Sequence, residues 1–534
     1  MNQVSRAPVR PVRFASRLST CMLSACTLAT LVAGAVHAQS DPQLVDRNLA
    51  VRTAASGLTT PIGMAFLSAS DWLVIEKDTG RVQRVVNGAV MSTALDLAVN
   101  SASERGLLGI TLHPDFASNR YVYLFWSCRA APPPESNPYF PTAETCAATP
   151  ELGADTDDIL AVPLLGNRVD RFVWDGASLT FDRNLITLRA FQNDGGPLPA
   201  GQGDEGQPAR GNHDGGVIRF GRDGKLYIQF GDVGRRGQLQ NLPSGPTETG
   251  QGTTVPDDQF GGPEPDNAHF TGVVIRLNDD GSTPVDNPFF AAGAEIGGEV
   301  GANVQRIFSY GLRNGFGMAF DPLSDRLWQQ ENGEDAFDEL NLVARGSNSG
   351  WIQLMGPSTR VAEFREIETT SLNNEDTPNL QQLRWGPERI ATTRAEALSR
   401  LFMLPGAHYS EPEFSWKYVL APAGIGFLDS RALGPQYRGD LFVGFSTFAT
   451  LGGPLFRFNL TGNRNKVAVD DPLLEDRVMD NATFYDMTEG ETLLFGTHFG
   501  IVTDIQTGPN GNLFLVSLAD GKVFEVYRRV PGTR

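Results

Sequence analysis

A repeated hairpin pattern is the feature that most constrains the fold of this chain. Six times, an apolar strand is followed by a turn containing Gly, Asp, Asn or Pro and then by a second apolar strand. Turns such as GRDGK and GPNGN have the composition that tight hairpins require. The six instances lie at residues 61–77, 106–126, 215–232, 317–332, 424–446 and 504–520. The repeat predicts a series of similar antiparallel β units.

Other segments extend these units. Third strands are expected at residues 81–86, 168–174, 273–278, 455–460 and 523–528, whereas helical periodicity is nearly absent outside residues 393–402. The pattern predicts an all-β fold, a six-bladed β-propeller with long loop insertions, because a radial array leaves only short, protected edges. A β-sandwich fits less well, since a sandwich need not repeat. We expect residues 44–53 to form the outer strand that closes the ring beside the last blade.

The N-terminus resembles a secretory signal. Residues 1–38 combine several arginines, an apolar stretch and the small-residue cleavage site Val36-His37-Ala38. A membrane anchor and a lipoprotein signal at residues 23–26 are the alternatives. The predicted domains are therefore a signal peptide at 1–38 and a single six-bladed propeller at 39–534, in a periplasmic or secreted protein. No apolar run of about 20 residues follows the signal, so no membrane span is expected after its removal.

Charge and cysteine content narrow the possible partners. The chain carries 44 basic and 62 acidic residues, a formal charge of −18, which argues against binding nucleic acid through a basic face. Only Cys128 and Cys146 lie outside the signal. In an exported protein they predict one disulfide worth about 3 kcal/mol, with two free thiols as the alternative. No C-x-x-C-H motif is present, so no covalent haem is expected on this chain.

Three long insertions interrupt the repeats, at residues 128–165, 233–268 and 352–412. Each is polar or rich in Pro and Gly. Loops on one face of a propeller commonly frame a site, so these segments are either lids over a pocket or inert decorations.

The hairpin at residues 215–232 brings two functional side chains together. His213 opens its first strand and Asp232 ends its second, and the midpoint between them falls within the turn. Opposed residues in an antiparallel pair have neighbouring Cβ atoms, so the two side chains should meet. A carboxylate on one imidazole nitrogen leaves the other free to act as a general base. The alternative is a buried hydrogen bond that only stabilises the blade.

The next unit begins with Arg313 and Asn314, a guanidinium and an amide that suit a planar, oxygen-rich ligand. After its second strand comes the segment Asn332-Gly333-Glu334-Asp335, interpreted as a tight acidic turn with exposed carbonyls. Such a turn could bind Ca²⁺, because hard cations prefer oxygen ligands. An acidic surface turn without a metal is the alternative.

Together these segments resemble the soluble quinoprotein sugar dehydrogenases, the glucose/sorbosone dehydrogenase family, which use pyrroloquinoline quinone (PQQ). The resemblance rests on five segments in the same order along the chain: ERGLLGITLHPDF (104–116), NHDGGVIRFGRDGKLYIQFGDVGR (212–235), VVIRLNDDGSTPVDNP (273–288), YGLRNGFGMAFDP (310–322) with ENGEDAFDELN (331–341), and SWKYVLAPAG (415–424). It implies a propeller that holds PQQ and Ca²⁺ on one face and oxidises the C1 hydroxyl of an aldose to a lactone.

The resemblance also implies roles for individual residues. His213 would be the catalytic base and Asp232 its partner, while Arg313 and Asn314 would contact the quinone. The other implied positions are the backbone carbonyls of Gly333 and Glu334 as Ca²⁺ ligands, and Trp416 against the cofactor plane. A sugar or related alcohol would be the substrate, and the electrons would pass to a separate acceptor.

The sequence departs from the family pattern where the cofactor's carboxylates are held. The blade-five segment 442–458 contains no lysine, and Ile501 and Thr503 stand where the family has two arginines. Lys417 and His498 are the nearest candidate substitutes. Glu104 occupies the place of a substrate-binding glutamine. A cofactor-free binding propeller and a Ca²⁺-dependent propeller lactonase are therefore alternative functions.

Overall fold

The innermost strands of the repeats contact one another in a closed circle. In the computed structural model, which describes residues 41–132, 143, 145–190, 211–233, 270–370, 390–447 and 451–530, the strands form six sheets. The first strands of successive hairpins touch in the order β3, β7, β11, β15, β21, β27 and again β3. Their bounds are β3 (Pro61–Ser68), β7 (Leu107–Leu112), β11 (Ile218–Phe220), β15 (Gly317–Phe320), β21 (Pro422–Phe427) and β27 (Val502–Thr507). The all-β propeller expected from the repeat is confirmed.

Each hairpin continues outward into further strands. The first three sheets add β4 (Asp71–Glu76), β5 (Arg81–Val86) and β6 (Ala89–Asp96); then β8 (Tyr121–Ser127), β9 (Asn167–Trp174) and β10 (Leu179–Leu188); then β12 (Leu226–Phe230), β13 (Val273–Leu277), β14 (Ile307–Tyr310), β18 (Ser347–Asn348) and β19 (His408–Tyr409). All six predicted hairpins and all five predicted third strands are confirmed by the strand pairing.

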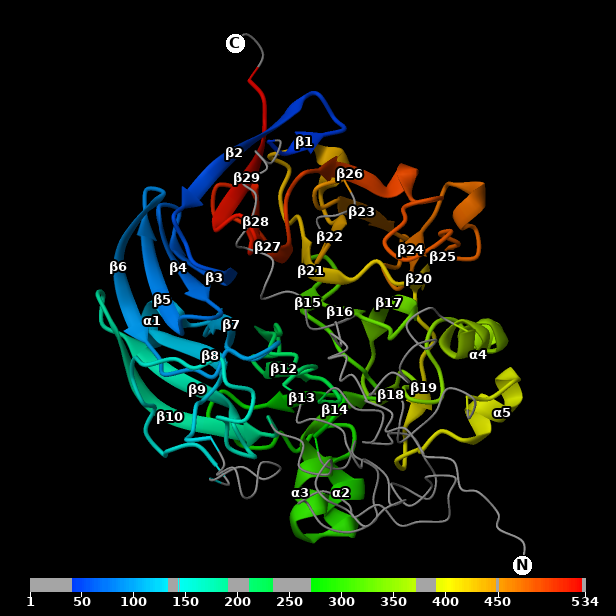
Figure 1. Cartoon of the computed structure of the whole chain (residues 1–534), viewed down its shortest axis with the longest axis horizontal. Helices are drawn as coiled ribbons and strands as arrows, with labels where there is room; N and C mark the ends of the chain where they lie inside the picture. Colours follow the sequence, from blue (N-terminus) through cyan, green and yellow to red (C-terminus); the bar gives the residue numbers. More distant parts are fainter. Residues whose placement is uncertain are drawn as a thin grey trace, which may run out of the picture. The chain divides into compact units, whose positions relative to one another are not determined.

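The remaining sheets follow the same plan. They add β16 (Leu327–Glu331), β17 (Ala336–Val343), β20 (Phe414–Tyr418) and β25 (Val478–Met479); then β22 (Leu441–Phe445), β23 (Leu455–Leu460), β24 (Val467–Ala468), β26 (Leu494–Thr497) and β1 (Gln43–Leu44); and finally β28 (Leu513–Ser517), β29 (Lys522–Arg528) and β2 (Leu49–Ser56). In Figure 1 the colours pass around the sheets from blue β3–β6 through green β12–β14 to red β27–β29.

The two ends of the described chain close the circle. Strand β2 pairs with β29, so an N-terminal strand completes the C-terminal sheet as expected. The expected range 44–53 is corrected, because Leu44 belongs to β1 and pairs with β26 of the neighbouring sheet. Antiparallel pairing of the first and last strands joins the ends without leaving an open sheet edge between them.

Helices were underestimated from the sequence. The predicted helix at residues 393–402 is present as α5 (Arg394–Ser399). Four more helices occur in connections: α1 (Phe116–Asn119), α2 (Phe290–Ile296), α3 (Gly298–Arg306) and α4 (Val361–Thr370). No helix within the described residues is long and apolar enough to cross a membrane. The signal peptide expected at residues 1–38 and nearly all of the insertion at 233–268 lie outside the described residues.

Aliphatic and aromatic side chains fill the spaces between the sheets. The cluster between β7–β9 and β11–β14, for example, contains Phe125, Ile228, Phe230, Ile275 and Tyr310, each fully buried. The first strand of a hairpin begins, and the second ends, at the same end of a sheet. The residues just before β7, β11 and β15 and just after β12 and β16 therefore share one rim of the molecule, which is where the sequence places its candidate site.

Candidate active site

His213 and Asp232 meet at this rim. Nδ1 of His213 lies 2.5 Å from Oδ1 of Asp232, and both side chains are almost fully buried. The predicted contact across the hairpin is confirmed. His213 has a left-handed backbone with φ of 60°, which is uncommon outside glycine and persists only where the surroundings fix it. Nε2 of His213 has no hydrogen-bond partner within the described part of the chain, so this nitrogen is available to a substrate.

Asp232 is held from two further directions. The indole Nε1 of Trp351 donates to its Oδ2 over 2.8 Å, and its backbone N–H donates to the carbonyl of Arg313 over 2.8 Å. Gly231 allows this approach, because a Cβ there would lie 2.4 Å from the His213 carbonyl oxygen. Trp351 was not identified from the sequence. Since 119 positions separate it from Asp232, no local pattern could have revealed the contact.

Glu104 joins His213 to the next sheet. Its Oε2 accepts a hydrogen bond from the backbone N–H of His213 over 2.6 Å and another from Nδ2 of Asn314 over 3.2 Å. Its own backbone N–H donates to the carbonyl of Gly211. Three segments that are far apart in the sequence are therefore fixed together by one carboxylate.

Arg313 is buried beside this group. Its Nη1 donates to the carbonyl of Asn332 over 2.8 Å, and its Nη2 pairs with the carboxylate of Glu334. Its guanidinium also lies over the ring of Trp351, 5.6 Å from the centroid. Burial acts to lower the pKa of Arg313, but the negative charges of Glu334 and Asp232 outweigh it and raise that pKa. Arg313 therefore stays a cation inside the protein.

The acidic segment 332–335 is largely buried, which argues against the alternative of an acidic surface turn, while the expected role of its carbonyls toward Ca²⁺ stays a prediction. Asn332 and Asp335 are buried. The N–H of Gly333 donates to Oδ1 of Asp338 over 2.9 Å. The N–H groups of Asp335 and Ala336 donate to Glu368 of α4, so the insertion at 352–412 supports this segment from behind. The segment is buried because the residues that follow it form buried strand β17 rather than a surface loop.

Two carboxylates face each other behind Arg313. Glu331 ends β16 and is paired directly with Glu339 of β17, and Nδ2 of Asn341 donates to both. Burial raises the pKa of each carboxyl group, in the case of Glu339 to about 7. Glu331 also accepts a hydrogen bond from the backbone N–H of Arg313. The pair therefore fixes the start of the segment that carries Arg313 and Asn314.

Trp416 and Lys417 have their contacts elsewhere. Trp416 is fully buried and packs edge-on against Phe414, Phe445 and Phe458 in a hydrophobic cluster. Nζ of Lys417 lies 2.6 Å from Oε1 of Glu363 on α4. The structure thus brings together Glu104, His213, Asp232, Arg313, Asn314 and Glu334, and it gives Trp416 and Lys417 other neighbours. Their roles toward a cofactor remain predictions.

A second pair of oppositely charged residues adjoins this group in the sequence. Arg105 and Asp214 follow Glu104 and His213 in the chain, and both are completely buried. Burial lowers the pKa of Arg105 to about 10 and raises that of Asp214 to about 6, and each charge opposes the shift of the other. Nδ2 of Asn167 donates to Oδ1 of Asp214 over 2.7 Å. This pair was also missed from the sequence.

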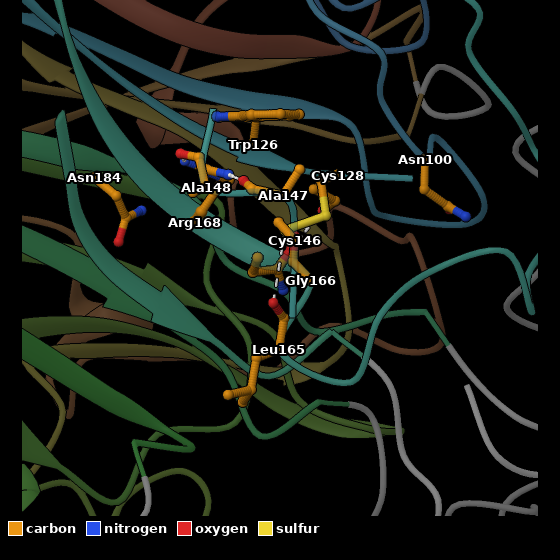
Figure 2. Close-up of a disulfide and its surroundings, with 12 residues drawn as sticks. Asn100, Trp126, Cys128, Cys146, Ala147, Ala148, Leu165, Gly166, Arg168 and Asn184 are labelled. Carbon is orange, nitrogen blue, oxygen red and sulfur yellow. Dashed lines mark hydrogen bonds between the residues drawn. A yellow bond between two sulfur atoms is a disulfide. The ribbon is translucent and has the colours of Figure 1, made fainter. Parts of the chain in front are cut away.

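The disulfide-bonded insertion supports Arg105. Cys128 and Cys146 form the predicted disulfide, with Cα atoms 6.1 Å apart. Figure 2 shows it beside Leu165 and Gly166, with Arg168 reaching toward Ala147. Within the same insertion, the carbonyl of Ile159 accepts a hydrogen bond from Nη1 of Arg105 over 2.8 Å. The described part of the insertion at 128–165 therefore supports Arg105, which follows Glu104 in the chain.

The residues present can be tested against PQQ and Ca²⁺. Two amide oxygens, Asn314 Oδ1 and Asn332 Oδ1, are buried without a hydrogen-bond partner within the described ranges. Oxygen donors next to Gly333 and Glu334 are the chemistry that Ca²⁺ prefers, and a polar planar ligand would satisfy Asn314. This side of the site fits the group. The described residues contain no cluster of three or more His, Cys, Asp or Glu side chains that could hold a metal.

Comparisons with known proteins agree with this geometry. The family model for glucose/sorbosone dehydrogenase matches residues 58–138 and 204–360. The chain is 27% identical over 350 residues to quinoprotein glucose dehydrogenase B of Acinetobacter calcoaceticus, covering 63% of this chain and 59% of that protein. It is 25% identical over 475 residues to the aldose sugar dehydrogenase YliI of Escherichia coli strain K12, covering 88% of this chain and 91% of that one.

A solved structure shows the same fold. The soluble aldose sugar dehydrogenase from Escherichia coli in its apo-form superposes with a TM-score of 0.54 at 22% identity, covering 90% of this chain and all of that one. The matched family ranges contain every residue of the group around His213, whereas Trp416 and Lys417 lie beyond them. The resemblance seen in the sequence is thereby confirmed over the matched residues.

Proposed function

We propose that this protein is an exported quinoprotein dehydrogenase that oxidises the C1 hydroxyl of an aldose or a related alcohol to a lactone. The observation that carries the proposal is the contact of His213 Nδ1 with Asp232 Oδ1 at 2.5 Å, directly beside Arg313 and Asn314. An imidazole with one nitrogen engaged by a carboxylate and the other unoccupied is arranged as a general base. The names of the two curated relatives support the reaction class.

His213 handles the proton. Because Nδ1 faces Asp232, Nε2 is the nitrogen that takes the proton of the C1 hydroxyl. Asp232 stabilises the imidazolium that forms, and Trp351 and the backbone of Arg313 keep that carboxylate in place. The chemistry that bound PQQ supplies is hydride acceptance at its quinone, with Ca²⁺ as the Lewis acid on the quinone oxygens.

The remaining residues bind and orient. Arg313 and Asn314 would hold the quinone, while the backbone carbonyls of Gly333 and Glu334 would ligate the Ca²⁺. Asn314 donates to Glu104, so the substrate-side carboxylate and the cofactor-side amide move as one unit. Burial of this group excludes water from the reacting atoms and strengthens each polar contact.

Several features complete the proposal. We count each of the six sheets as one blade of a six-bladed propeller at residues 39–534, which follows a cleaved signal peptide at 1–38. The acidic chain would work in the periplasm or outside the cell, where Cys128 and Cys146 can form a disulfide. With no haem motif in the sequence, a separate acceptor would collect the electrons.

Reconstitution tests this function. Protein stripped with a chelator is titrated with PQQ and Ca²⁺ in a calorimeter, and reduction of an artificial dye is then followed with a panel of aldoses. The expected result is PQQ binding in the micromolar range or tighter, with dye reduction that requires PQQ, Ca²⁺ and an aldose together. Absence of both binding and turnover would overturn the proposal.

A cofactor-free binding propeller is the second candidate. It is favoured by two positions considered for holding the cofactor's carboxylates: Ile501, beside the last sheet, is a buried apolar residue, and Lys417, on the fourth sheet, is already paired with Glu363. In that case PQQ would not bind in the calorimeter, and the contact between His213 and Asp232 would be structural. Turnover of lactones without any quinone would instead indicate a Ca²⁺-dependent lactonase.

A further inference from the structure

The carboxylate of Glu104 has one oxygen that the protein does not use. Oε2 accepts both hydrogen bonds, from His213 and from Asn314, and this places the group between the proposed base and the proposed cofactor contact. Oε1 has no hydrogen-bond partner among the residues that the structure describes. Glu104 is only partly buried, so a ligand at the rim can reach that oxygen.

Among the residues that the structure describes, no neighbouring cation forms an ion pair with this carboxylate. Arg313 is paired with Glu334, and Arg105 donates to the carbonyl of Ile159 and influences the charge of buried Asp214. Nζ of Lys77 on the adjacent blade is 2.8 Å from Asp78. No ion pair involves Glu104 within the described ranges. A substrate next to His213 would therefore meet a negative charge that has no counter-ion among the described residues, in surroundings where charges interact more strongly than in water.

We propose that Glu104 selects the substrate by charge, so that the site prefers positively charged amino sugars and neutral aldoses over sugar acids and sugar phosphates. The inference rests on the proposed function and names the substrate class of the same site. A hydroxyl or an ammonium group can donate to Oε1 of Glu104, whereas a carboxylate or phosphate there would have no donor to offer and would be repelled. A glutamine at this position would use its single oxygen to accept from His213 and Asn314, and its uncharged NH₂ group would face the substrate as a donor.

Kinetic specificity tests this inference. We would measure kcat/KM of the PQQ- and Ca²⁺-loaded enzyme for glucosamine, glucose and glucuronate at a pH of about 6, below the pKa of the amine. The expected order is glucosamine, then glucose, then glucuronate, with about a tenfold or larger difference between the first and the last. In Glu104→Gln, the ratio of kcat/KM for glucosamine to kcat/KM for glucuronate should shrink toward one. The matched control is Glu299→Gln, which removes the same charge from an exposed position on α3 and should keep the wild-type order.

Two further measurements make the outcome decisive. Raising the salt concentration should reduce the preference in the wild-type enzyme, because an accessible charge is screened. Calorimetric binding of glucosamine and glucuronate reports the same preference without turnover. If no aldose is oxidised, the proposed function fails, but the binding preference still decides the role of Glu104. Equal binding of the two sugars, or an unchanged preference in Glu104→Gln, would overturn the inference.

Discussion

Two sides of the same rim are built differently. Around His213, Asp232 and Arg313, each polar side chain is held by partners from several chain segments, and the family match covers all of them. At the last sheet, Ile501 just before β27 is buried, and Lys417, on β20 of the fourth sheet, is engaged by Glu363 of an inserted helix. The difference teaches that the residues proposed to handle the proton are held by many contacts, whereas two positions considered for anchoring a cofactor are apolar or already paired.

The largest expected effect concerns the base. Replacing His213 with Ala should reduce kcat/KM for dye reduction by about 10²–10⁴-fold, because the proton of the C1 hydroxyl then has no acceptor. Asp232→Asn should lower the rate less, since the imidazole remains but loses its charged partner. The measurement is steady-state kinetics after PQQ and Ca²⁺ loading, with circular dichroism to verify folding. If His213→Ala retained wild-type turnover, the contacts around His213 and Asp232 would have only a structural role.

Stability should depend strongly on the charged pair behind the base. Arg105→Met leaves the carboxylate of Asp214 buried without its counter-charge, so it should destabilise the fold by about 3–5 kcal/mol in urea unfolding. The double variant Arg105→Met/Asp214→Asn should recover much of that loss. Equal stability of the single and the double variant would show that the two charges do not interact.

The same pair predicts a dependence on pH. The pKa of Asp214 is raised to about 6 by burial, so between about 4 and 6 the folded state holds a proton that the unfolded state has released. This group therefore contributes stability at low pH that is lost as the pH rises, by at most about 1.4 kcal/mol per unit. Unfolding of Asp214→Asn should lack this contribution. A variant whose stability changes with pH as in the wild type would contradict the assignment.

The smallest effect is expected at Lys417, on strand β20 of the fourth sheet. Lys417→Ala removes a partly exposed ion pair with Glu363, which is worth about 1 kcal/mol or less, and should change the affinity for PQQ by no more than about twofold. The measurement is calorimetric titration of the Lys417→Ala variant with PQQ, with a His498→Ala variant titrated in parallel. If Lys417→Ala weakened PQQ binding tenfold, Lys417 would be an anchor after all, and the contrast between the two sides would disappear.

Much of the fold could be predicted because its signals are local. A hairpin needs an apolar strand, a turn and a second strand within about 20 residues, and all six were recognisable. Strand β17 was missed because residues 335–341 contain acidic side chains that resemble a surface turn. In the structure Asp338 is buried and accepts hydrogen bonds from the N–H groups of Gly333, Leu420 and Ala421. A strand whose buried polar side chains are satisfied by hydrogen bonds in this way does not show a regular alternation of apolar and polar residues.

The same difference between local and long-range contacts explains which parts of the site could be predicted. The contact between His213 and Asp232 could be predicted because one hairpin forms it. Trp351, Glu368 and the pair of Arg105 with Asp214 could not, since their partners lie in distant segments that no local pattern connects. Helix α4 was missed for a related reason: its buried face, which includes Phe364 and Ile367, occupies only part of one insertion.

A structure of the protein crystallised with PQQ and Ca²⁺ tests the central claim most directly. The account predicts that PQQ lies against Arg313 and Asn314, with Nε2 of His213 facing the open side where a sugar would bind. It also predicts Ca²⁺ at the carbonyls of Gly333 and Glu334. PQQ bound elsewhere, or a rim that stays empty at saturating PQQ while His213 and Asp232 remain in contact, would contradict it.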